Sequence, residues 1–194
     1  MWSFGFYIEL GLGHVLDLSA YDHILFLMAL TIPYTFRLWK QVLTLVTIFT
    51  VAHCLSLALS VYEVVEVDVA LIEFLIPVTI LLTALFNLRE GLKQHSDLSF
   101  KLQAAATGFF GLIHGFGFSN YFKMLMAGEV EKLNPLLGFA TGIELSQVVV
   151  IVGVLLLAAL LEGVLRLPRK YFIIGTTAVV ILITLPMIIG TWPA

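Results

Sequence analysis

The sequence predicts an all-α protein, a polytopic membrane helix bundle, from its composition, its hydropathy and the lengths of its apolar stretches. Of its 194 residues, 60% are hydrophobic and only 12% are charged, whereas a soluble domain is nearer half apolar and a quarter charged. Mean hydropathy is +1.05. Several stretches reach the roughly 20 apolar residues that a membrane span needs. With no linker, repeat or low-complexity tract, residues 1–194 are expected to form a single integral membrane domain.

The elements follow in chain order. Residues 4–16 are apolar but too short for a clear span, so we expect an interfacial or re-entrant helix there, or a seventh span if they cross. The next helix is expected to begin near Ser19, because Ser19 and Asp22 fit a capping box, and to run to about Arg37 as a span. Five clear spans complete the six expected transmembrane helices, at about 41–62, 69–88, 103–127, 136–161 and 171–191.

Basic residues in the connections predict an orientation. Eight of the ten lysines and arginines fall between the first and second, third and fourth, and fifth and sixth spans: Arg37, Lys40, Arg89, Lys93, Lys101, Arg166, Arg169 and Lys170. The other two connections are mainly acidic. The positive-inside rule makes the basic side cytoplasmic, so both termini are expected on the outer side of the membrane.

Ionisable side chains within the spans are the main indication of function, because in hydrocarbon they rarely persist without a partner, an ion or a task. A helical rise of about 1.5 Å per residue puts Asp22 and Glu73 within about 6 Å of the outer boundary and Glu144 at roughly 12 Å. His53 and His114, which enter from the inner side, fall near the midplane. Together they predict a polar funnel that opens outward.

Imidazole plus carboxylate is a natural ligand set for a divalent transition metal. His23 follows Asp22 directly, so the imidazole can bind a metal while the carboxylate also binds it or fixes the tautomer. The alternative is an interfacial histidine beside a capping Asp22, and that capping role is compatible with metal binding. His14 and Asp17 lie in the short N-terminal stretch and join the set if that stretch reaches the site.

The two mid-span histidines have different neighbours. His53 has Ser56 three residues later, on a neighbouring face of the helix, as a supporting hydroxyl. The alternative is a neutral core histidine that bonds to a backbone carbonyl. His114 lies between Gly111 and Gly115, which let another helix approach closely, so its ring is expected to point into the bundle.

Two further spans carry carboxylates. Glu144 and Gln147 share a helix face with Thr141, and a carboxylate, an amide and a hydroxyl suit an ion or proton site. The alternative is an interhelical hydrogen-bond clamp with a protonated Glu144. Glu73 precedes Pro77, which can kink or loosen its helix, and it is expected to support the site unless it is a boundary carboxylate.

Other classes of protein and site are disfavoured. No basic patch suggests nucleic acid. The single cysteine, Cys54, excludes an intramolecular disulfide and a multi-cysteine zinc site, and we expect it to be a packing residue. His95 lies in a polar loop and is expected to be solvated. The sequence contains no glycine-rich phosphate loop and no His-Glu-x-x-His pair.

These segments together resemble the HupE/UreJ family of small bacterial membrane proteins, and more closely its second branch. The match covers nearly the whole chain, and its most specific parts are the Asp22-His23 pair and the His-Gly-Phe-Gly-Phe element at 114–118. Family members are regarded as nickel or cobalt permeases. The resemblance implies a functional set of His14, Asp22, His23, His53, His114 and Glu144. Two features depart from the family pattern: His14 stands eight residues before Asp22 instead of six, and Cys54 occupies a position where serine is common.

The sequence therefore predicts a divalent transition-metal permease for Ni²⁺ or Co²⁺, with an intramembrane His/carboxylate site and no catalytic residue. The alternative is an intramembrane zinc-dependent hydrolase, in which three histidines and an aspartate hold Zn²⁺ and Glu144 is the general base. A third interpretation is an accessory subunit whose polar residues only join helices. The sequence decides neither the metal nor whether the chain forms a homo-oligomer in the bilayer.

Overall fold

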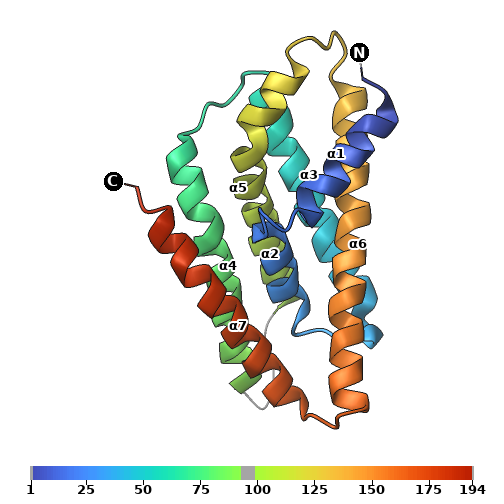
Figure 1. The fold of residues 1–194 in the computed structure, drawn as a ribbon, viewed down its shortest axis with the longest axis vertical. Coiled ribbons are helices and arrows are strands. Elements are labelled where there is room, and N and C mark those ends of the chain that lie inside the picture. The colour runs from blue at the N-terminus through green and yellow to red at the C-terminus, as the bar shows by residue number, and fades with distance from the viewer. Residues whose placement is uncertain (1, 93–98, 194) are drawn as a thin grey trace.

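The computed structural model describes residues 2–92 and 99–193, and this part of the chain folds into α-helices alone (Figure 1). Lys93 and His95 lie outside the described residues. The helices are α1 (Phe4–Leu16), α2 (Asp22–Thr31), α3 (Trp39–Val61), α4 (Val69–Leu92), α5 (Phe100–Met126), α6 (Leu133–Gly163) and α7 (Arg169–Gly190), with a 3-10 turn at Phe36–Leu38. The predicted all-α class is confirmed.

The predicted multi-pass membrane bundle is also confirmed. Within residues 2–92 and 99–193, four segments are long and apolar enough to cross a bilayer: Phe36–Val61, Val69–Arg89, Leu133–Gly163 and Arg169–Gly190. Their outward faces carry many exposed apolar side chains, as expected where the surrounding solvent is lipid. α5 has 27 residues and packs along α3, and α1 and α2 are shorter apolar helices.

α1 and α2 together cross the bundle once, as two half-helices (Figure 1). α1 runs from the N-terminal end to about mid-height, the chain turns through residues 17–21, and α2 continues toward the opposite end. Their 13 and 10 residues give lengths of about 20 and 15 Å, and each is shorter than a hydrocarbon core of about 30 Å. The crossing is therefore interrupted in the middle of the bundle.

The bounds of α2 correct the expectation of one helix from Ser19 to Arg37. α2 ends at Thr31, and Pro33 two residues later has no N–H with which to continue it. The predicted capping box is also wrong. The backbone N–H and the hydroxyl of Ser19 both donate to the Asp17 carboxylate, and no side chain in the described part of the chain caps the start of α2.

Glycines bring two pairs of helices into backbone contact. A Cβ atom added to Gly11 of α1 would lie 2.3 Å from the carbonyl oxygen of Phe139 in α6, so α1 packs into the bundle and is not an interfacial helix. A Cβ atom added to Gly115 of α5 would lie 2.3 Å from the carbonyl oxygen of His53 in α3. The second contact is the predicted glycine seam, and it joins the two helices that carry His53 and His114.

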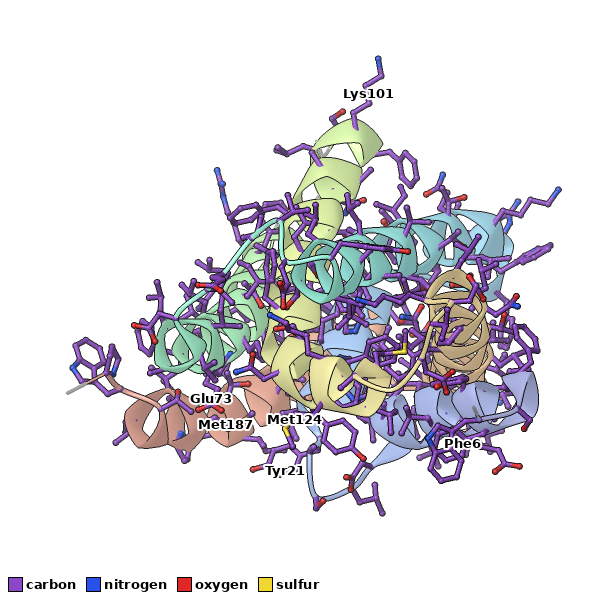
Figure 2. The ribbon with its side chains drawn as sticks, turned by 90° about the horizontal axis from the view of Figure 1, so that it is seen from above. Phe6, Tyr21, Glu73, Lys101, Met124 and Met187 are labelled. Carbon is purple, nitrogen blue, oxygen red and sulfur yellow. The ribbon has the colours of Figure 1, made fainter. Side chains whose placement is uncertain are left out.

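The charged connections separate to the two ends of the bundle. Residues 32–38 and 164–168 lie at one end with the basic side chains, and residues 62–68 and 127–132 lie at the other end with the acidic ones (Figure 1). Seen from above, α5 is tilted, and Lys101 at its basic end projects away from the bundle (Figure 2). The N-terminus lies at the acidic end.

Candidate metal site

Four histidines from four helices meet in the interior, where α1 ends and α2 begins. The ring centroids of His14 and His23 are 4.5 Å apart, and that of His53 is 5.6 Å from each of them. The ring of His114 is 5.4 Å from that of His23. His23, His53 and His114 are buried, and His14 is half-buried. The break between α1 and α2 thus places His14 and His23 beside the two mid-span histidines.

Among the residues that the structure describes, two overlapping groups of side chains have the spacing of metal ligands. One is His14, His23 and His53, and the other is Asp22, His23 and His114; within each group the ligand atoms lie within 4.8 Å of one another. Two nitrogens bound to one ion at about 2.0–2.1 Å are at most about 4 Å apart, so a small adjustment of side chains would close either group on an ion. His23 belongs to both groups.

The ring nitrogens that face this space have no hydrogen-bond partner among the described residues. They are Nε2 of His14, Nε2 of His23, both nitrogens of His53 and Nδ1 of His114. A buried polar atom left unpaired costs about 1–3 kcal/mol, and native structures pair most such atoms. Several unpaired nitrogens on adjoining rings therefore indicate a site for an ion.

Hydrogen bonds on the outer sides of two rings orient them toward this space. The Asp22 carboxylate lies 3.1 Å from Nδ1 of His23, and the Thr79 hydroxyl lies 3.0 Å from Nε2 of His114. The Thr79 hydroxyl already donates its single hydrogen to the carbonyl of Ile76 at 2.7 Å, so it accepts from Nε2–H of His114. This leaves Nδ1 of His114 deprotonated, as a metal ligand requires.

A pocket of about 620 Å³ leads to the histidines between α1, α2, α4 and α5. His14, His23 and His114 contribute to its lining. Its wall also carries four carboxylates, those of Glu9, Asp17, Asp22 and Glu73, while none of its described lining residues is lysine or arginine. A cleft lined by one sign of charge concentrates ions of the opposite sign. The pocket is suited to a hydrated cation.

Glu144 lies away from this group, in the contact between α3 and α6. Its carboxylate makes hydrogen bonds with the hydroxyls of Thr47 and Thr50, the latter at 2.6 Å. Gln147 Oε1 lies 3.1 Å from the same Thr50 hydroxyl. Glu144 is therefore in neither of the two potential ligand groups among the described residues, and its surroundings match the interhelical clamp.

The other supporting residues have separate positions. The Ser56 hydroxyl donates to the backbone carbonyl of His53 at 2.8 Å, so it contacts the backbone of that histidine. Thr141 is exposed and bonds to the carbonyl of Leu137 in its own helix. Cys54 is half-buried and packs against the hydrophobic core.

Two residues with roles at the site were missed from the sequence. Thr79 orients His114, and its signal is a hydroxyl in an apolar span, two residues after Pro77. Glu9 lines the pocket, and its signal is a carboxylate in the same short apolar stretch as His14. Both residues stand out in the sequence as polar groups in apolar stretches, but their positions in the sequence do not indicate which helix each side chain faces.

A comparison with known families identifies one match. The family model described as HupE / UreJ protein matches residues 1–190. No curated protein and no solved structure matches the chain.

Proposed function

Because this chain belongs to the HupE / UreJ family, which is associated with nickel and cobalt transport, we propose that it is a permease for Ni²⁺ or Co²⁺. The observation that carries the proposal is the set of unpaired imidazole nitrogens beside an acidic pocket. Imidazole and carboxylate without thiolate suit these borderline ions. We assign the ligands to His14, Asp22, His23, His53 and His114, with Glu73 in the pocket wall and Glu144 as a support of the α3–α6 contact.

The proposed path begins in the pocket, where the carboxylates of Glu9, Asp17 and Glu73 attract the hydrated dication. Asp22 and His23 then replace part of its water shell. Because His23 belongs to both ligand groups, the ion passes between them without losing all of its protein ligands. A permease needs several moderate sites, since one tight site would hold the ion. Protons compete with the metal for the imidazoles, so acid weakens binding.

The direction of transport follows from the charges at the two ends. The pocket is lined by the halves of α4 and α5 that lie nearest the acidic connections. The positive-inside rule assigns the basic end to the cytoplasm. We therefore propose that the pocket faces outward from the bacterial inner membrane, with both termini on that side, and that the chain imports the ion.

Three of the four histidines together with Asp22 also favour, as a second candidate, a zinc-dependent hydrolase. Such an enzyme needs a general base within hydrogen-bond reach of the zinc-bound water. Glu144, the predicted base, instead bonds to Thr47 and Thr50. This arrangement supports the permease over the hydrolase.

Metal influx into proteoliposomes that contain a metal-sensitive dye tests the proposal. Wild-type protein should admit Ni²⁺ or Co²⁺, and Asp22→Asn should slow influx at least tenfold, because it removes the one carboxylate within the ligand groups. Glu66→Gln is the matched control, since Glu66 is an exposed carboxylate in the acidic connection 62–68 and should leave influx unchanged. Liposomes that stay impermeable while the protein retains one tightly bound Zn²⁺ would overturn the permease and favour the hydrolase.

A further inference from the structure

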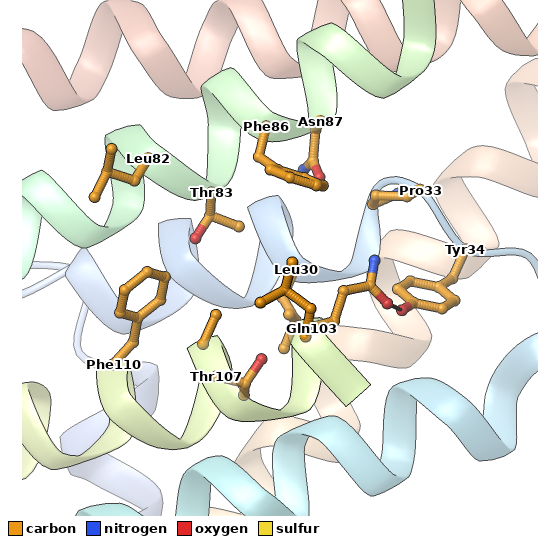
Figure 3. A pocket seen from close by; sticks show the side chains of 12 residues that line it. Leu30, Pro33, Tyr34, Leu82, Thr83, Phe86, Asn87, Gln103, Thr107 and Phe110 are labelled. Atoms are coloured by element: carbon orange, nitrogen blue, oxygen red, sulfur yellow. Dashed lines mark hydrogen bonds between the residues drawn. The ribbon is translucent and has the colours of Figure 1, made fainter. Parts of the chain in front are cut away.

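A second cavity, of about 320 Å³, lies between the end of α2 and the basic-end halves of α4 and α5. Phe110 stands at one end of it, and the hydrogen-bonded pair Tyr34 and Gln103 stands at the other (Figure 3). Phe110 precedes His114 by four residues, about one turn of α5. The metal site therefore lies between two cavities, the acidic pocket on one side and this cavity on the other.

Polar side chains connect the metal site to this cavity along α4. Thr79, which bonds to His114, is followed at intervals of four residues by Thr83 and Asn87, and residues four apart lie on one face of a helix. Thr83 and Asn87 both line the cavity. Their donor groups are bonded to the backbone carbonyls of Thr79 and Ala29, which leaves the side-chain oxygens available as acceptors. The stripe therefore indicates a route from the histidines toward the basic end.

α5 supplies a second polar stripe opposite the first. Gln103 and Thr107 are four residues apart and both line the cavity, and His114 follows Thr107 by seven residues, about two turns. Figure 3 shows Thr83 and Thr107 on opposite walls, with Leu30 of α2 between them and the Tyr34–Gln103 pair. The oxygen atoms of the two stripes could replace part of the water shell of a passing cation.

An aromatic layer separates the cavity from the histidines. Phe26 stacks on Phe49 with ring centroids 4.8 Å apart, and both rings contact His114 at 5.1 and 5.3 Å. Phe110 meets the ring of Phe26 edge-on at 6.2 Å. Phe26 and Phe49 are at most 1% exposed. This layer closes the site on the side of the second cavity.

We infer that this cavity is the inner vestibule through which the metal ion leaves toward the basic end, and that Phe110 and Phe26 form the gate between it and the histidines. The inference rests on the proposed permease function. Apolar constrictions gate ion paths by excluding water, and the acidic pocket on the other side makes this the outward-facing state. An acyl chain is the competing occupant of an apolar cavity in a bilayer, but the polar stripes that continue to His114 favour water and an ion.

Cysteine accessibility tests the vestibule without any metal. In a Cys54→Ala background, Thr83→Cys is exposed to a cationic, membrane-impermeant methanethiosulfonate in right-side-out and inside-out vesicles. It should react only from the basic end, at least tenfold faster than Leu85→Cys, because Leu85 is an exposed residue of α4 outside the cavity lining. Glu66→Cys, in the acidic connection, is the control that shows in which vesicles the reagent reaches the acidic end of the bundle. Ala106→Cys, on the α5 wall, repeats the measurement if Thr83→Cys does not fold.

The gate is tested by opening it. Phe110→Ala should make Thr83→Cys react from both sides, whereas Phe109→Ala, which changes a ring that is 61% exposed on the outside of α5, should leave the reaction one-sided. Equal, slow reaction of the vestibule and Leu85 cysteines would indicate an acyl chain and overturn the vestibule. One-sided reaction in Phe110→Ala would overturn the gate. Influx of Ni²⁺ with unreactive vestibule cysteines refutes only this inference. Reactive cysteines without influx refute the permease and with it the exit route, and leave a cavity that is open to water from the basic end.

Discussion

Gly115→Ala should disrupt the metal site without touching any proposed ligand. The added Cβ atom would lie 2.3 Å from the carbonyl oxygen of His53 and 2.0 Å from the Ser56 hydroxyl. The hydroxyl can rotate away, but the carbonyl belongs to the backbone of α3. A comfortable contact begins near 3.4 Å, so α3 and α5 must separate by about 3.4 − 2.3 = 1.1 Å. Overpacking of this kind costs about 1–3 kcal/mol.

The consequence for binding is larger than the consequence for folding. α3 carries His53 and α5 carries His114, and metal–nitrogen distances tolerate changes of only about 0.2 Å. A shift of about 1 Å should therefore lower the affinity for Ni²⁺ or Co²⁺ at least tenfold, while the melting temperature falls by a few degrees. Titration calorimetry and thermal denaturation of the detergent-solubilised protein measure the two effects.

Gly108→Ala is the matched control for this change. Gly108 lies on the same helix, and among the described residues its added Cβ atom would meet only the Cγ2 atom of Ile48, at 3.4 Å. It should bind metal like the wild type. Wild-type affinity in Gly115→Ala, or an equal loss in both variants, would show that the α3–α5 spacing does not set the geometry of the site.

Two further predictions concern hydrogen bonds. Thr79→Val should weaken metal binding by about 10–100-fold, because loss of a partner that fixes a ligand's tautomer has this effect. Thr44→Val should not, because the exposed Thr44 hydroxyl bonds to the carbonyl of Lys40 in its own helix. Calorimetry that finds equal affinities in the two variants would show that Thr79 does not orient His114. Glu129→Gln should remove a pH dependence of stability: the backbone N–H of Trp2 and then the hydroxyl of Tyr7 donate to Glu129 and lower the pKa of its carboxyl below the usual value. Because the pKa in the folded state is lowered, the stabilisation is complete above the ordinary carboxyl range and disappears as pH falls through the lowered pKa. The melting temperature, measured from pH 7 to pH 3, should therefore fall more steeply in wild type than in the variant.

Much of the fold was predictable because spans are read from local composition. The five clear spans match α3 to α7 within a few residues, and the glycine seam beside His114 joins α5 to α3 as expected. The segment before them was not predictable in the same way. Its apolar residues fit one span from Ser19, and the break at residues 17–21 places two half-helices inside the bundle instead.

For the candidate site, too, the residue types were predictable from the sequence and their spatial arrangement was not. The sequence by itself determined that Asp22, His23, His53 and His114 are polar groups within apolar segments, because residue type fixes composition. The rise per residue placed Asp22 near the outer boundary, but the break between α1 and α2 puts the start of α2, and Asp22 with it, at about mid-height (Figure 1). Only the tertiary structure decided which of them meet. Depth does not fix the direction in which a side chain faces, and this direction depends on how each helix is rotated against its neighbours. Glu144 therefore faces the hydroxyls of Thr47 and Thr50, whereas His14 reaches the site because a half-helix ends there.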